Sequence, residues 1–162
     1  MSNQHISVPV IGTVVGGHHG RLDDFKGNVE SIIRLAPGIP ENALQGIEEF
    51  SHVQVIWHFS QGSDHDVEFP PRSPRDNPVW PATGGLVHRN HRRPARLGTS
   101  FPRLLRVNGR DLYVEDLDAD DGTPVIDLVP VFREMMPRGP VHQPAWPTEM
   151  LSDYWESAEK RP

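Results

Sequence analysis

Two adjacent segments of the chain carry the side chains that could do chemistry. Residues 84–110 contain seven arginines and no acidic residue, whereas residues 111–127 contain seven acidic residues and no basic one. A guanidinium group presents a fork of N–H donors that fits a carboxylate or a phosphate. The first segment therefore predicts a site that attracts an anion, directly followed in the sequence by an acidic turn.

Each segment also has a simpler explanation. Four arginines surround a proline in the sequence GGLVHRNHRRPARLGTS at residues 84–100, which indicates either a rigid anion-binding loop or a basic surface loop without a ligand. The acidic turn, residues 118–124, could offer carboxylate and backbone hydrogen bonds to ribose hydroxyls or an adenine edge. It could equally be an ordinary exposed turn.

Histidine and cysteine content argues against metal and covalent chemistry. His52 and His58 share one face of an expected strand but lie roughly 20 Å apart at ~3.3 Å per residue, too far to hold one ion. The other close histidine pairs lack a carboxylate at a familiar metal-binding spacing. The chain has no cysteine, and it carries neither a nucleophile elbow nor a phosphate-binding glycine loop. We therefore expect no metal and no covalent intermediate.

Length and composition limit the fold and the location. The 162 residues carry a net charge of −6, which is unusual for a dedicated nucleic-acid binder. No run of apolar residues approaches the ~20 needed to cross a membrane, and no secretory signal is visible. We expect one domain over residues 1–162, no membrane contact and a cytoplasmic location. Seventeen prolines and fourteen glycines favour short strands and many turns over a helical bundle.

Hydrophobic periodicity places the elements that must position these segments. The clearest signals are the alternation at residues 52–60 and the Asn108-Gly109 hairpin turn. Strands are expected at residues 6–15, 28–35, 52–60, 98–107, 110–117 and 124–129, and short helices at 40–50 and 148–159. Proline-rich residues 68–83 form an ordered loop. The expected fold is mainly β, a small single-sheet β-barrel of about six strands with a short helix and a C-terminal helix.

Four motifs, in this order, match a known family. They are Ile11-Gly12, LQGIEEFSH at residues 44–52, Arg89 with RPARLG at residues 93–98, and DGTPVID at residues 121–127. The chain resembles the TsaA-like family, also called TrmO-type. The named members of that family are S-adenosylmethionine (SAM)-dependent methyltransferases acting on N6 of a threonylcarbamoyl-modified adenosine in tRNA. The resemblance covers about residues 6–133, and residues 134–162 look like the tail of a short-chain subgroup.

The resemblance implies where a cofactor would bind. The family has a β-barrel that dimerises and binds SAM near the dimer interface, so a homodimer is expected here. The implied SAM contacts fall on Ser60, Gln61, Arg89, Arg93, Leu97, Gly98, Thr99, Asp120, Asp121, Gly122 and Thr123.

The chain departs from the family pattern where a substrate would bind. A Pro-Arg-Gln segment is absent from the first long loop, Ala95 replaces an asparagine, and residues 127–131 lack the usual lysine and tyrosine. His88 stands where the family has a threonine. Because tRNA binds mainly through its phosphates, an acidic chain with these losses is expected to act on a small molecule rather than on tRNA.

Three functions remain open at this level. The first is methyl transfer from SAM to a small molecule or nucleobase, with His88 or His58 as the base. The second uses SAM as the sole substrate: its own Cα or carboxylate displaces methylthioadenosine, giving 1-aminocyclopropane-1-carboxylate or homoserine lactone. The third is a non-catalytic module that binds SAM or nucleic acid.

Overall fold

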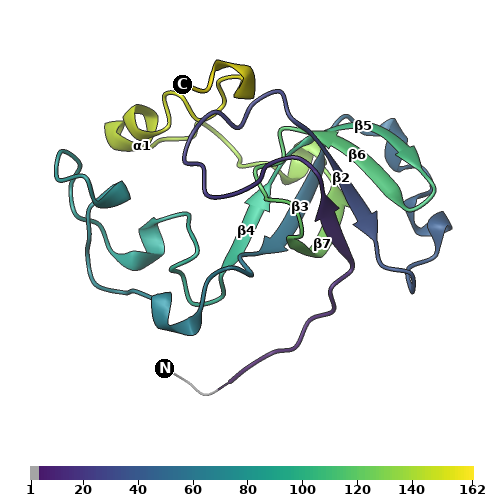
Figure 1. The fold of residues 1–162 in the computed structure, drawn as a ribbon, viewed down its shortest axis with the longest axis horizontal. Helices are drawn as coiled ribbons and strands as arrows, with labels where there is room; N and C mark the ends of the chain where they lie inside the picture. Colours follow the sequence, from purple (N-terminus) through teal and green to yellow (C-terminus); the bar gives the residue numbers. More distant parts are fainter. Residues whose placement is uncertain (1–3) are drawn as a thin grey trace.

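A single antiparallel sheet of seven strands organises the protein, in the order β4-β3-β7-β1-β2-β6-β5 (Figure 1). The computed structural model describes residues 4–162. The strands are β1 (Gly12–Val15), β2 (Glu30–Leu35), β3 (Val53–His58), β4 (Leu97–Ser100), β5 (Arg103–Asn108), β6 (Asp111–Glu115) and β7 (Pro124–Pro130). The helices are α1 (Ala145–Met150) and the 3-10 turns η1 (Glu41–Leu44), η2 (Ile47–Glu49), η3 (Asp64–Asp66), η4 (Pro74–Asp76), η5 (Gly85–Val87), η6 (Arg133–Met135) and η7 (Ala158–Lys160). Within residues 4–162 no helix has the length and apolar character of a membrane span.

Strand β3 confirms the predicted alternation. Val53, Val55 and Trp57 are buried, while the residues between them are half-exposed. This period of two directs one face of the strand into the hydrophobic core. The core also receives side chains from β1, β2, β6 and β7 and from the segment just after β6, namely Val14, Ile33, Leu112, Val114, Leu117 and Val125.

The mainly β prediction is confirmed, but the sheet does not close into a barrel. Strands β4 and β5 are its two edges and pair with β3 and β6, respectively. About six strands were expected from the sequence. The single strand predicted at 98–107 is in fact two strands, β4 and β5, divided at Phe101-Pro102. Pro102 has no N–H to donate to a ladder, which favours a break at this point.

The predicted hairpin between β5 and β6 is confirmed, with its loop one residue later than expected. Asn108 pairs with Asp111, so Gly109 and Arg110 form the two-residue loop. Gly109 has a φ of +60°. A two-residue hairpin of type II′ needs glycine at this first loop position, because side chains disfavour positive φ there.

Three predicted elements are shorter than expected. The first strand begins at Gly12 rather than at residue 6, and residues 5–10 form an exposed extended arm. The expected helix at 40–50 is two 3-10 turns separated by Gln45 and Gly46, and Gly46 has a φ of +85°. Such a left-handed residue cannot continue a right-handed helix.

The expected C-terminal helix at 148–159 is also wrong in its bounds. Only Ala145–Met150 are α-helical. The carbonyl oxygens of Asp153 and Tyr154 accept hydrogen bonds from the backbone N–H groups of Phe25 and Lys26 at 3.0 and 2.7 Å. These carbonyls therefore hold the C-terminal tail, defined here as residues 136–162, against the loop that precedes β2.

Candidate functional site

A cleft of about 1260 Å³ opens beside the ends of β3 and β4. Its walls come from the arginine loop (residues 84–96), the acidic turn (residues 118–124), the proline-rich loop and the tail. These loops are distant in sequence, and Figure 1 shows the tail lying above the segment that contains the proline-rich loop. The cleft is therefore built mainly from long connections around one end of the sheet.

The strand side of the cleft, here called the strand wall, is tightly packed. Trp57 lies opposite Gly98 in the β3–β4 ladder, and its Nε1–H donates to Ser100 Oγ at 2.9 Å. A Cβ atom on Gly98 would lie 2.4 Å from the Trp57 indole. Glycine is therefore required at this point for the indole to lie flat against β4. Ser100 in turn donates to Asp118 Oδ1 and connects the strand wall to the acidic turn.

Most of the clustered arginines are neutralised by acids from elsewhere in the chain. The pairs are Arg92–Glu68, Arg96–Asp64, Arg103–Glu115 and Arg106–Glu30. Arg89 and Arg93 differ, because they donate to the backbone carbonyls of Thr99, at 3.2 Å, and Leu97. Within residues 4–162 neither makes an ion pair. Both line the cleft, so their positive charges remain available to an anionic ligand.

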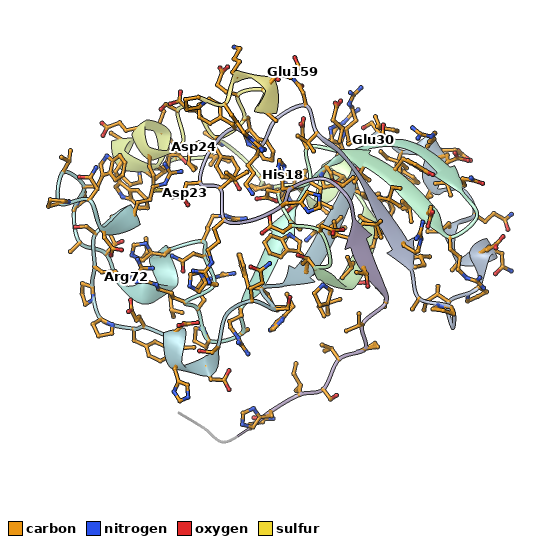
Figure 2. All side chains as sticks on the ribbon, viewed as in Figure 1. His18, Asp23, Asp24, Glu30, Arg72 and Glu159 are labelled. Atoms are coloured by element: carbon orange, nitrogen blue, oxygen red, sulfur yellow. The ribbon has the colours of Figure 1, made fainter. Side chains whose placement is uncertain are left out.

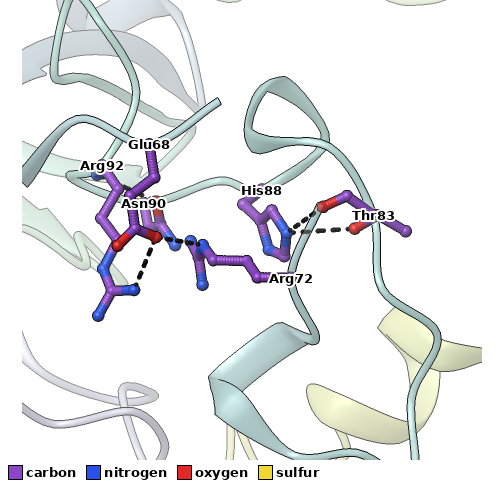
Figure 3. A network of polar contacts seen from close by, with 6 residues as sticks. All are labelled: Glu68, Arg72, Thr83, His88, Asn90 and Arg92. Carbon is purple, nitrogen blue, oxygen red and sulfur yellow. Dashed lines mark hydrogen bonds and ion pairs between the residues drawn. The ribbon is translucent and has the colours of Figure 1, made fainter. Parts of the chain in front are cut away.

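Glu68 makes Arg72 and Arg92 less available to an anionic ligand than Arg89 and Arg93. Figure 3 shows its carboxylate between two guanidinium groups, with Oε2 at 3.1 Å from Arg72 Nε and 3.0 Å from Arg92 Nη1. One carboxylate thus balances part of the charge of two cleft residues. The anion-attracting field predicted from seven arginines is concentrated at two of them.

The acidic turn contributes two carboxylates to the cleft, Asp118 and Asp120. Burial raises the pKa of Asp120, against the opposing effect of Lys26, whose Nζ lies 3.7 Å from Asp120 Oδ1. Asp121 instead accepts a hydrogen bond from the Gly16 backbone N–H at 2.8 Å and holds the turn to the loop after β1. The sequence does not distinguish these roles, because all three aspartates lie within four residues.

A buried lysine and histidine beneath the turn were not predicted as part of the site. Lys26 is 5 % exposed and His18 is 1 % exposed, and Figure 2 shows His18 in the interior of the fold. Burial, then the charges of Lys26 and Arg161, lowers the pKa of His18 to about 4, so the imidazole is neutral at neutral pH. The only available sequence signal was that the chain has two lysines against fourteen arginines.

The tail forms the other side of the cleft, here called the tail wall. Tyr154 O–H donates to Asp118 Oδ2 at 2.6 Å. Trp146 and Trp155 also line the cleft. The expected helix at 148–159 included Tyr154 and Trp155, but the sequence did not place them at the site, because that placement depends on non-helical backbone.

The structure brings the predicted arginine-rich and acidic segments together on one cleft. The predicted site residues that line it are Ser60, Gln61, His88, Arg89, Arg93, Leu97, Gly98, Thr99, Asp120 and Thr123. Three others do not line it: His58, Asp121 and Gly122. The SAM-binding role of the lining residues stays a prediction at this point.

The two histidines predicted as bases occupy unfavourable positions. His88 is 5 % exposed, and its Nε2 lies 3.1 Å from the Thr83 carbonyl oxygen (Figure 3). Because a carbonyl oxygen only accepts, Nε2 carries the proton and Nδ1 is the nitrogen left to accept one. His58 lies outside the cleft lining, and burial followed by the charge of Arg96 lowers its pKa. Their catalytic roles therefore stay predictions.

The proline-rich loop is tied to the rest of the cleft rim by one ion pair and one hydrogen bond. Arg75 donates to both carboxylate oxygens of Asp24, at 2.8 and 2.9 Å; Figure 2 labels Asp24 beside the tail. Trp80 Nε1–H donates to Glu149 Oε2 on α1 at 2.9 Å. Among residues 4–162 no group of three histidine or carboxylate side chains is placed to share a metal ion.

Comparison with known proteins identifies the family. The sequence model of the tRNA-methyltransferase O N-terminal domain matches residues 21–135. The mouse tRNA (adenine(37)-N6)-methyltransferase is 35% identical over 91 residues, 56% of this chain and 21% of the mouse protein. A probable S-adenosyl-L-methionine-binding protein of Pyrococcus abyssi is 31% identical over 107 residues, 66% of this chain and 55% of the archaeal one.

A solved structure has the same fold. The crystal structure of TrmO from Pseudomonas aeruginosa aligns with a TM-score of 0.69 and 22% identity, covering 87% of this chain and 61% of that one. The chain thus spans about a fifth of the mouse relative and about half of the archaeal one. The family match includes the arginine loop and the acidic turn but ends before the tail. This chain belongs to the tRNA-methyltransferase O N-terminal domain family.

Proposed function

We propose that the cleft binds SAM and directs transfer of its methyl group to a small molecule or nucleobase. The observation that carries this proposal is that Arg89 and Arg93, which form no ion pair within residues 4–162, share one cleft with Asp118 and Asp120. SAM carries a carboxylate, an ammonium and a sulfonium, so it needs both kinds of partner. Relatives of this chain are named as SAM-binding proteins or SAM-dependent methyltransferases.

The residues present fit such a ligand. The two guanidinium groups would hold the carboxylate by charge-assisted hydrogen bonds. Asp120 would bind the ammonium or the ribose hydroxyls. A cleft of about 1260 Å³ exceeds the ~300–1,000 Å³ usual for one small ligand, which leaves space for an acceptor beside the methyl donor.

The contribution of the protein would be positioning. When bound, SAM supplies an already activated methyl group, so no covalent enzyme intermediate is needed. The strand wall and the arginines would fix the donor, and the remaining cleft surface would hold the acceptor at near-attack distance. His88 Nδ1 is a candidate to accept a proton from the acceptor, since its other nitrogen is committed to Thr83.

A small acceptor is favoured over tRNA by the charges of this chain. Curated relatives are named as tRNA methyltransferases. Here four of the seven clustered arginines are ion-paired, and the net charge is −6. Few cations are therefore left for a phosphate backbone.

The family resemblance also supports a homodimer with the SAM site near the subunit contact. Light scattering on the purified protein, with and without SAM, tests this part of the proposal. A monomeric mass under both conditions would contradict it.

Calorimetric titration with SAM tests the binding site. Arg89→Ala is expected to weaken SAM affinity roughly 10- to 100-fold, because a hydrogen bond to a charged group contributes about 1.5–3 kcal/mol. Arg106→Ala is the matched control, since Arg106 pairs with Glu30 on the sheet away from the cleft. The Arg106→Ala variant should bind SAM with the native affinity. Equal affinity of the Arg89 variant and the control would remove Arg89 from the site.

Product analysis by mass spectrometry tests the reaction. The protein is incubated with SAM alone, with SAM and adenosine, and with SAM and total tRNA. S-adenosylhomocysteine formed with adenosine supports the proposal. S-adenosylhomocysteine formed with tRNA but not with adenosine would contradict the small acceptor. Methylthioadenosine formed from SAM alone would contradict methyl transfer.

A further inference from the structure

The tail adds a surface to the cleft beyond the stretch that the family's sequence model matches. The family match ends at residue 135, yet eight residues between 143 and 155 line the cleft. None of residues 136–162 is buried. The tail is placed instead by backbone hydrogen bonds to residues 25–27. Gly27 permits this contact, because a Cβ atom there would lie 2.1 Å from the Trp155 carbonyl oxygen.

Two aromatic rings of the tail lie together at this surface. The rings of Tyr154 and Trp155 pack edge to face, with centroids 5.0 Å apart and planes at 87°. Both rings line the cleft. Burial and the neighbouring Asp118 raise the pKa of Tyr154, so its phenol keeps the proton that it donates to Asp118.

The carboxylate of Asp118 gives this surface its negative charge. Asp118 accepts hydrogen bonds from two uncharged donors, Ser100 and Tyr154. No basic side chain within residues 4–162 forms an ion pair with it. Aromatic faces beside an unpaired carboxylate are the surroundings in which a weakly hydrated cation is most stable. Arg89 and Arg75 also act on Tyr154 and lower its pKa, but less strongly than Asp118 raises it.

We propose that Tyr154 and Trp155 of the tail, together with Asp118, form a subsite for the sulfonium centre of the bound methyl donor. The inference rests on the proposed binding of SAM. The subsite would attract the cationic sulfonium and would lose that attraction for the neutral thioether of the product. The tail would thereby favour binding of fresh donor over spent product, a specificity that the arginines alone do not supply.

Calorimetric titrations with SAM and with S-adenosylhomocysteine test the subsite. The native protein is expected to bind SAM more tightly than the thioether. Trp155→Leu should weaken SAM binding roughly 2- to 30-fold, the range of a cation–π contact, and leave the affinity for the thioether within about twofold. Tyr154→Phe keeps the ring and should keep most of the preference for SAM.

Trp80→Leu is the matched control. Trp80 also contacts the tail, through Glu149, but does not line the cleft. The ratio of the affinities of the Trp80→Leu variant for SAM and for S-adenosylhomocysteine should equal that of the native protein. Equal weakening of both ligands by Trp155→Leu, or an unchanged ratio, would overturn the subsite while leaving SAM binding intact. Failure of the native protein to bind SAM would overturn the proposed function and the subsite with it.

Discussion

The two walls of the cleft are held in place by different forces. On the strand wall, Trp57 and Ser100 are 6 % and 5 % exposed, and the β3–β4 ladder fixes both. The tail wall has no buried residue, and its helix α1 has only six residues. Helices this short gain little stability by themselves. The tail is therefore held mainly by hydrogen bonds to residues 25–27.

This difference assigns separate tasks to the walls. A segment with few buried apolar contacts opens at a lower free energy than the core of the sheet. The strand wall can fix one ligand in a constant position. The tail wall is expected to open more readily than the strand wall, because it has no buried residue. A change at His18 is expected to have the largest effect on stability, a change in the strand wall a smaller one, and a change in the tail wall the smallest.

The largest effect is expected from protonation of His18, which joins the acidic turn to the tail. Its backbone bridges to Asp120, and its Nδ1 lies 3.2 Å from Nη2 of Arg161 in the tail. The pKa of His18 is lowered from 6.5 to about 4, so the unfolded chain binds this proton more readily. Its contribution is complete above about pH 6.5 and falls by roughly 3 kcal/mol as pH approaches 4.

Denaturant unfolding at about pH 7 and about pH 4.5 measures this loss. Other groups also titrate in this range, so the comparison is with His18→Gln, which cannot take up the proton. The variant should show a shallower loss of unfolding free energy. Identical pH dependence in the two proteins would show that His18 does not titrate as its burial requires.

The strand wall is tested by Gly98→Ala. The added Cβ would lie 2.4 Å from the Trp57 indole, whose Nε1–H is fixed by Ser100. Overpacking of a core contact costs about 1–3 kcal/mol of unfolding free energy. Gly38→Ala is the control, because nothing lies within 4 Å of its added Cβ. Equal stability of both variants would mean that the strand wall can yield.

The smallest effect on stability is expected from Gly27→Ala, which acts on the tail wall. The added Cβ would lie 2.1 Å from the Trp155 carbonyl oxygen and would displace the tail. Because no residue of the tail is itself buried, the loss of unfolding free energy should stay below about 1 kcal/mol. Limited proteolysis should cut the tail faster in the variant. A large loss of stability with an uncut tail would place the tail in the cooperative core.

The sequence predicts the sheet well because strand signals are local. The alternation at 52–60 and the turn at Gly109 depend on residues that are neighbours in the chain. The arginine loop and the acidic turn were also predicted to form one site, and they meet on one cleft. The motifs RPARLG at residues 93–98 and DGTPVID at residues 121–127, which led to this prediction, lie within the family match.

The remaining features depend on contacts between distant segments. Lys26 and Tyr154 reach the cleft through backbone hydrogen bonds between residues 25–27 and 153–156, which no periodicity reports. The pairing of Arg92 and Arg96 with Glu68 and Asp64 is equally non-local. A count of charges along the sequence therefore overestimated the number of cations available to a ligand.

The position of the two chain ends has a practical consequence. The exposed arm at residues 5–10 leads away from the sheet, whereas Arg161 donates to the Phe25 carbonyl oxygen beside the cleft rim (Figure 1). An affinity handle or a chip linkage placed after residue 162 would lie close to the loops that line the cleft. The same attachment ahead of the arm would leave those loops untouched, so immobilised assays should use the amino-terminal side.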